Sequence, residues 1–189
     1  VAGKAIGQLI LRKPEDHGFV ALKKLDLSHN LLGNEGCAAI LEHIPKGGHI
    51  DNLLLTNNQI TFILNDLFEK EISTSIVSIV HLTLDHNPFR SGGYYKLANF
   101  VSMLVHLRTI SLKHCLINDK GCTMVFDYFA CLRRLEKIDL SHNDITDKGI
   151  RAIHNCIGDK YVSAQTLSRL DTILLNSNKI TNTGVKIFL

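Results

Sequence analysis

The strongest constraint on the fold of this chain is a 15-residue pattern that returns six times along its 189 residues. The most complete copy, LEKIDLSHNDITDKG (residues 135–149), follows the template L-x-x-L-x-L-x-x-N-x-I-x-x-x-G. A unit repeated at a fixed short period stacks on its neighbours, because one copy cannot bury its apolar face alone. The copies begin at positions that differ successively by 28, 29, 28, 28 and 35 residues: Leu22, Ile50, Ile79, Leu107, Leu135 and Leu170.

Each copy divides into a short strand and a helical segment. In the x-L-x-L-x portion, alternation turns the leucine and isoleucine side chains toward a core and the intervening side chains toward the opposite face. Helical crossovers between successive strands make the strands parallel and the connections right-handed. We therefore predict an α/β solenoid, a right-handed horseshoe with a parallel concave sheet and convex helices. Its predicted strands are residues 24–28, 52–56, 81–85, 109–113, 137–141 and 172–176.

Two further columns of the template have structural interpretations. An inward amide at template position nine can satisfy backbone groups exposed where the chain leaves the strand. The glycine six residues later fits a backbone position that needs positive φ or a close approach. The second copy has Leu64 instead of this glycine, and we expect Phe62 and Phe68 to fill the space there. The asparagine column is Asn30, Asn58, Asn87, Asn143 and Asn178, with Cys115 in the fourth copy.

The two ends of the chain also follow the repeat. Residues 1–12, VAGKAIGQLILR, match the helical half of a copy whose strand half is missing, and residue 189 falls within the last helix. We therefore expect one repeat domain over residues 1–189, with both ends cut from a longer array. The one substantial insertion, GDKYVSAQTLSR (residues 158–169), should lie at the surface, where it can either contact a partner or be a tolerated loop.

Composition excludes several classes of protein. Hydrophobic residues make up 45% of the chain, enough for a sizeable core, and the net charge of +3 comes from scattered residues. We therefore expect no nucleic-acid partner and no membrane partner. Cys37 and Cys122 take core aliphatic positions of the template, and the chain has no N-x-S/T acceptor. Buried thiols of this kind indicate a reducing, intracellular location in the cytoplasm.

The period, the asparagine, the glycine and the helical second half together resemble the ribonuclease-inhibitor type of leucine-rich repeat. The resemblance covers essentially the whole chain, and it implies a protein partner held on the curved surface. Similar repeats occur in NOD-like receptors, Ran GTPase-activating proteins and actin-regulating scaffolds. The copy at residues 107–122 looks like the cysteine-containing repeats of F-box ubiquitin-ligase adaptors. The alternative function is therefore a regulatory segment of a larger signalling protein, such as a NOD-like receptor, a GTPase-activating protein or a ubiquitin-ligase adaptor.

The outward strand positions are the side chains that a partner on the concave face would meet. Among them, Leu54 and Leu174 are apolar where polar residues are usual, so they are candidate hot-spot contacts unless neighbouring loops cover them. The predicted partner-binding residues are Asp26, Ser28, His29, Leu54, Thr56, Thr83, Asp85, His86, Ser111, Lys113, His114, Asp139, Ser141, His142, Leu174 and Asn176.

Histidines recur in this set, and three of them, His86, His114 and His142, belong to consecutive copies. Neighbouring strands lie about 4.8 Å apart, so two imidazoles could share a metal ion, although a straight ladder does not surround a metal tetrahedrally. A pH-sensitive contact surface and an ordinary scaffold histidine are the other interpretations. The D-x-S-H letters of residues 26–29 and 139–142 resemble a hydrolase triad, but nothing supplies an oxyanion hole. We expect no enzyme activity, no cofactor, no metal and no small-molecule substrate.

Overall fold

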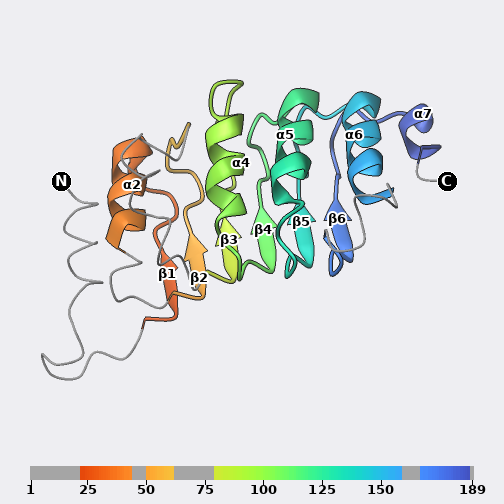
Figure 1. Cartoon of the computed structure of the whole chain (residues 1–189). Helices are drawn as coiled ribbons and strands as arrows, with labels where there is room; N and C mark the ends of the chain where they lie inside the picture. Colours follow the sequence, from red (N-terminus) through yellow and green to blue (C-terminus); the bar gives the residue numbers. More distant parts are fainter. Residues whose placement is uncertain (1–21, 44–49, 62–78, 159–166, 188–189) are drawn as a thin grey trace, which may run out of the picture.

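The computed structural model describes residues 22–43, 50–61, 79–158 and 167–187. Within them, six strands form one parallel sheet in sequential order (Figure 1). The segments for residues 1–12, for Phe62, Leu64 and Phe68, and for most of the insertion lie outside the described residues. The strands are β1 (Lys24–Asp26), β2 (Asn52–Leu54), β3 (His81–Thr83), β4 (Thr109–Ser111), β5 (Lys137–Asp139) and β6 (Thr172–Leu174).

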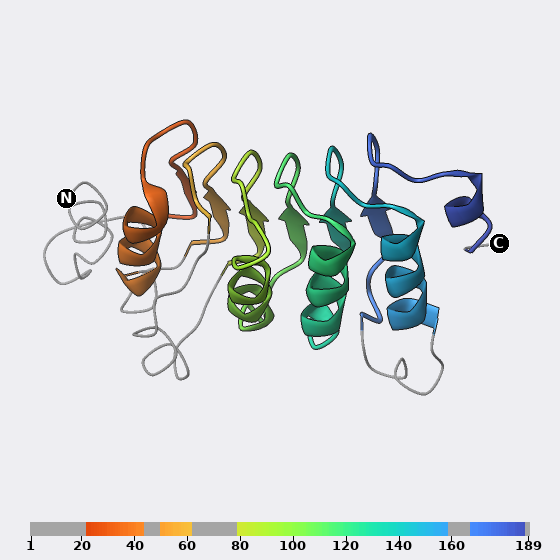
Figure 2. The same cartoon turned by 90° about the horizontal axis from the view of Figure 1, so that it is seen from above.

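The helices of the described residues lie on one side of the sheet, and none of them covers the other side (Figure 2). Equivalent template positions pair across the sheet without any shift, as in Leu25 with Leu53 and Leu53 with Leu82. This arrangement confirms the predicted parallel sheet with helical crossovers. None of the helices in the described ranges is long and apolar enough to cross a membrane. The helices are α2 (Gly33–His43), α4 (Tyr94–Ser102), α5 (Asp119–Phe129), α6 (Asp147–Gly158) and α7 (Asn182–Val185).

The strands are shorter than predicted, with three residues each where the alternation indicated five. The hydrogen bonding itself runs further, since Leu27 N donates to Leu54 O at 2.9 Å and His29 N donates to Thr56 O at 2.7 Å. The chain then leaves the extended conformation at template position eight, where His29 has a φ of 59° in the left-handed region. The alternating pattern extends past the strand, so pattern alone overestimates its length.

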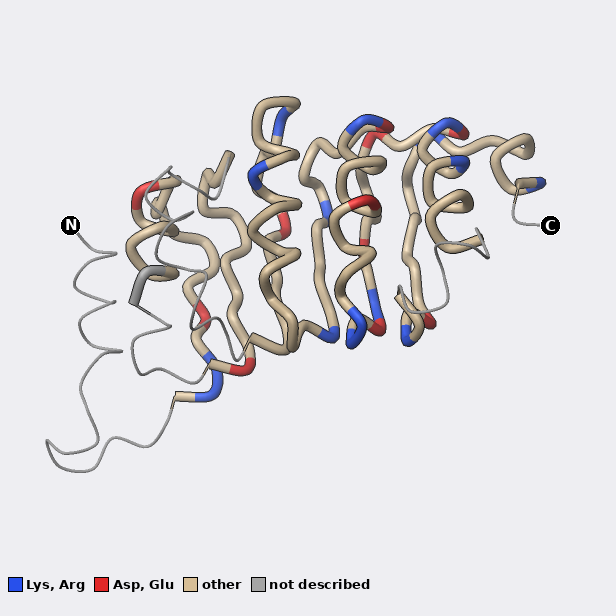
Figure 3. Tube along the Cα trace, viewed as in Figure 1, with Lys and Arg blue, Asp and Glu red and all other residues tan. Residues whose placement is uncertain are grey.

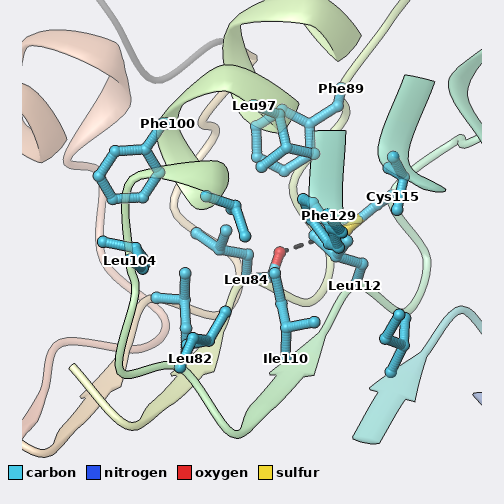
Figure 4. Packing of buried hydrophobic residues seen from close by; sticks show 14 of the residues in the cluster. Leu82, Leu84, Phe89, Leu97, Phe100, Leu104, Ile110, Leu112, Cys115 and Phe129 are labelled. Carbon is cyan, nitrogen blue, oxygen red and sulfur yellow. Dashed lines mark hydrogen bonds between the residues drawn. The ribbon is translucent and has the colours of Figure 1, made fainter. Parts of the chain in front are cut away.

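The core lies between the sheet and the helices, and it is continuous from one repeat to the next. Leu82 and Ile110 occupy equivalent positions on neighbouring strands, and each is 1% exposed. Phe129 of α5 and Leu97 of α4 cover this layer (Figure 4). Fully burying one such side chain contributes about 1.5–3 kcal/mol, so the stacked layers supply much of the stability.

The asparagine column confirms its predicted role, and Asn87 shows how. Its Oδ1 accepts from the backbone N–H groups of Asn58 and Ile60, both at 3.0 Å, and its Nδ2 donates to Leu55 O and Leu84 O, both at 2.9 Å. The amides of Asn58, Asn87, Asn143 and Asn178 each tie their own turn to the turn of the preceding repeat, whereas Asn30 is exposed and its amide donates within its own turn. In the fourth copy, Cys115 Sγ takes the donor role and bonds Leu84 O at 3.3 Å.

The template glycines serve close approach rather than unusual backbone angles. Gly93 has a φ of −93°, which any residue can adopt, but a Cβ added there would lie 2.1 Å from Thr61 O of the preceding repeat. At Gly149, an added Cβ would lie 2.8 Å from Asp119 Oδ1 of the preceding repeat. Of the two explanations that the sequence allowed, the structure supports the close contact between neighbouring repeats.

Candidate protein-binding surface

The side of the sheet that faces away from the helices, here called the strand face, carries the predicted binding residues. Asp26, His29, His86, His114, His142 and Asn176 are exposed on it. Asp139 and Ser141 differ from the expectation for an outward position, because they are only 5% and 3% exposed. The remaining eight are half-buried: Ser28, Leu54, Thr56, Thr83, Asp85, Ser111, Lys113 and Leu174.

Asp139 is bonded to its own turn and to a lysine of the preceding repeat. Its Oδ1 accepts from Ser141 N at 3.0 Å, and its Oδ2 forms an ion pair with Lys113 Nζ at 3.2 Å. Burial acts to raise the pKa of Asp139, but the hydrogen bonds from Ser141 and Lys113 outweigh it, so the pKa lies below its ordinary value. The carboxylate thus holds the turn in place and stays ionised.

The other two aspartates on the strand face are also bonded to the protein. Asp26 Oδ1 accepts from Ser28 N at 3.0 Å, and the hydrogen bonds from Ser28 lower the pKa of Asp26. Asp85 Oδ1 accepts from Ser111 Oγ at 2.6 Å and from Lys113 N at 2.9 Å. Charges of both signs are interspersed over the described chain (Figure 3). The strand face therefore carries charges of both signs, and its aspartates are hydrogen-bonded to the protein, so the face is not a surface of one charge.

The histidine column forms a stack of rings. The imidazoles of His86 and His114 have centroids 4.3 Å apart and planes 16° apart, and those of His114 and His142 have centroids 4.3 Å apart and planes 12° apart. Burial lowers the pKa of His114, and the neighbouring His86 and His142 lower it further. Within the described ranges, no group of three or more His, Cys, Asp or Glu side chains is placed to hold a metal ion.

The letters that resemble a hydrolase triad are arranged differently in space. The Asp139 carboxylate is used by the backbone of Ser141 and by Lys113, and the Ser141 hydroxyl is within 3.5 Å of Asn176 Nδ2. Ser141 is also nearly inaccessible. These contacts make the motif a structural element of the repeat.

A second polar column links the helix starts, and it was not predicted from the sequence. Asp119 Oδ1 accepts from Thr146 N at 2.7 Å and from Gly149 N at 2.9 Å, so the carboxylate of one repeat lies at the helix start of the next. Asp147 repeats the contact, accepting from Thr181 N at 2.8 Å. A signal for this column exists in the sequence. Each aspartate stands two residues before the template glycine of its own copy, and the threonine that it contacts stands three residues before the template glycine of the next copy.

Comparison with known proteins agrees with this geometry. A model of the Leucine Rich repeat family matches residues 22–41, 104–126 and 132–153. No curated protein matches the sequence. Among solved structures, an internalin (inlF) from Listeria monocytogenes is similar, with a TM-score of 0.50 and 16% sequence identity, over 95% of this chain and 46% of that one. The chain therefore spans about half the length of that internalin, and its fold is a leucine-rich repeat solenoid.

Proposed function

We propose that the chain is a non-catalytic scaffold that binds a protein partner on its strand face. The observation that carries this proposal is the continuous row of outward side chains from six consecutive parallel strands, on the side that the described helices leave uncovered. A surface of this kind can follow an extended partner over several repeats, as leucine-rich repeat proteins generally do. No described cluster assembles a nucleophile, a base and an oxyanion site on this face.

The chemistry of the strand face favours a protein partner over a strongly charged ligand. Its aspartates already accept hydrogen bonds from the protein, so a partner that covers them has a smaller desolvation cost to overcome than it would over unbonded carboxylates. Leu54 lies half-buried between Asp26 and Thr83 in the paired strand register, which gives the face an apolar position with a polar residue on either side. Interfaces concentrate binding energy in such partly enclosed apolar contacts, ringed by polar groups.

Site-specific crosslinking tests the position of the partner. A photoreactive amino acid placed at Thr83 on the strand face should give a discrete crosslinked product in an extract that contains the partner. The same group placed at Thr123, an exposed residue of α5 on the helix side, is the control. Crosslinks from Thr123 with none from Thr83 would move the binding site to the helices.

Substitution provides an independent test of the contacts. The double variant Leu54→Ala and Lys113→Ala should weaken the crosslinked complex at least tenfold, which is the effect of losing about 1.4 kcal/mol. A circular dichroism melt checks that the variant is folded. Unchanged binding in a folded variant would contradict the proposal for these strands.

We also propose a reducing, intracellular compartment for the protein. All five cysteines are free thiols, and Cys37, Cys115 and Cys122 lie in the core. Burial raises the pKa of each of these three thiols to about 12, which keeps them protonated and poorly reactive. Fractionation of cells that express the full protein, with thiol alkylation before lysis, tests this: disulfide-linked chains in a secreted fraction would overturn it.

The ribonuclease-inhibitor type of repeat is a further proposal, and the period of 28 to 29 residues over the first five copies supports it. Helices of 9 to 12 residues in α2, α4, α5 and α6 fit the same type. An experimental structure with irregular convex segments in place of these helices would contradict it.

A further inference from the structure

We propose that the turns after the first four strands, together with the histidine stack, form an interaction surface for an uncharged segment of a partner protein that carries an aromatic side chain. This surface, here called the turn ridge, consists of residues 29–31, 57–59, 86–88 and 114–116 with His142 at its end. The inference rests on the proposed scaffold function and specifies the chemistry of the partner. In Figure 2 these turns project away from the helices, toward the side of the strand face.

The turns hold their outermost side chains rigidly toward solvent. Asn143 Oδ1 accepts from both Cys115 N and Ile117 N at 3.0 Å, and Tyr94 Oη donates to Leu116 O at 2.6 Å. The backbone on both sides of Leu116 is therefore fixed, while its side chain is 42% exposed. Leu116 also has a φ of 58°, a left-handed conformation that costs a leucine free energy.

The ridge differs from the strand face in charge. None of the twelve residues in its four turns is Lys, Arg, Asp or Glu, and they include Leu31, which is 82% exposed. The next two turns carry Asp144 and Lys179, which pair with each other at 2.7 Å. An apolar segment bound on the ridge would therefore not remove water from any charged side chain of the four turns. This fits the cores of protein interfaces, which generally exclude charged groups and favour aromatic ones.

The imidazole stack gives the ridge a preference for aromatic rings. His114 has a ring on both faces, but the end ring His86 has its ring partner on one face only. The next position of the column is Asn57, whose Nδ2 lies 3.3 Å from His29 Nδ1, on the side away from the stack. A planar side chain from a partner can continue the stack at His86, and such aromatic pairs contribute about 0.5–1.5 kcal/mol beyond their buried area.

Acid should weaken this binding, because the stack is neutral only while its imidazoles are unprotonated. Charged groups that face the central ring are Asp85, which favours its protonation, and Lys113, which opposes it; Asp139 pairs with Lys113. Protonated rings 4.3 Å apart would repel each other and would resist burial under an apolar segment. An acidic partner would show the opposite dependence, with tighter binding at low pH.

Two probes with opposite expectations test the proposal on the 189-residue chain by NMR. Indole, a neutral aromatic, should shift the His86 ring signals and the Leu116 methyl signals saturably at pH 7.5. Its affinity should be lower at pH 5.5 than at pH 7.5, because protonated imidazoles repel each other and resist burial under an apolar ring. A hexaglutamate peptide should show no tightening at pH 5.5.

A matched pair of variants assigns the effect to the stack. His86→Asn keeps a residue that tolerates positive φ but removes the ring, so indole binding at pH 7.5 should be lost. His154→Asn, on α6, should bind indole as the unchanged chain does. Absence of indole binding at pH 7.5, pH-independent binding, or acid-enhanced hexaglutamate binding would each overturn the proposal. Crosslinks from Thr83 that persist in His86→Asn would leave the scaffold function intact while the ridge proposal fails.

Discussion

His86 and Asn87 are neighbours in one turn, yet their environments are opposite. Asn87 is fully buried and is bonded to two repeats, whereas His86 is exposed and its ring stacks on the ring of His114. Both residue types recur at the template period. A residue type that recurs at the template period can therefore be either structural or available to a partner. The direction of its side chain, into the core or toward solvent, distinguishes the two cases.

Asn87→Ala should give the most severe loss of stability. It removes a partner from two backbone N–H groups and from three carbonyl groups, of which Leu84 O keeps its bond from Cys115 Sγ. At about 1–3 kcal/mol for an unsatisfied group, we expect a total loss of about 4 kcal/mol. Urea denaturation measures it. His86→Asn, one residue away, should cost less than about 1 kcal/mol. Equal losses of stability in the two variants would contradict the conclusion that the asparagine column is structural and the histidine column is not.

Gly93 and Gly92 provide a second neighbouring pair, one inside the stack and one outside. Gly93→Ala forces a methyl group against Thr61 O, whereas a Cβ on Gly92 meets nothing within 4 Å. We expect Gly93→Ala to lose about 2–3 kcal/mol through overpacking between repeats, and Gly92→Ala to stay within about 0.5 kcal/mol of the unchanged chain. Thermal melts of the two variants check this, and a stable Gly93→Ala would show that the repeats can separate locally.

Asp119 and Asp127 make the same comparison along one helix. Asp119 is bonded to the next repeat through Thr146 and Gly149, whereas Asp127 is exposed on the same α5. Asp119→Ala should lower the free energy of unfolding by about 2 kcal/mol, since hydrogen bonds to a charged group are lost. Asp127→Ala should change it by less than about 0.5 kcal/mol. Chemical denaturation of both variants in parallel measures these changes. Equal changes in the two variants would mean that the Asp119 contacts do not stabilise the junction between the repeats.

The smallest effect is expected from the pH dependence of the histidine stack. Folding lowers the pKa of His114, so the unfolded chain binds the proton more tightly than the folded one. Stability should be complete above the ordinary histidine pKa of about 6.5 and should decline as the pH falls through it. His114→Asn should decline less between pH 7.5 and 5.5 in matched thermal melts. A parallel decline in both proteins would mean that other groups govern this range.

The repeat pattern predicted the sheet accurately because stacking repeats in register requires the same residue at the same depth in each copy. Leu53, Leu82, Ile110 and Ile138 therefore align across neighbouring strands as the template indicated. The candidate site was harder to predict, since an outward position in one strand can be covered by a side chain from a neighbouring repeat. Asp139 and Ser141 were covered in this way, through Lys113 and through the Asn176 side chain.

By itself, the sequence determined the period, the parallel strands, the buried asparagine amides and the core thiols, because each follows from how apolar and amide groups must be satisfied within one short unit. Only the tertiary structure decided which glycine explanation holds, that three imidazoles stack, and that the aspartate of one repeat lies at the helix start of the next. These features depend on the distance and angle between neighbouring copies. A single copy of the template contains no information about that geometry.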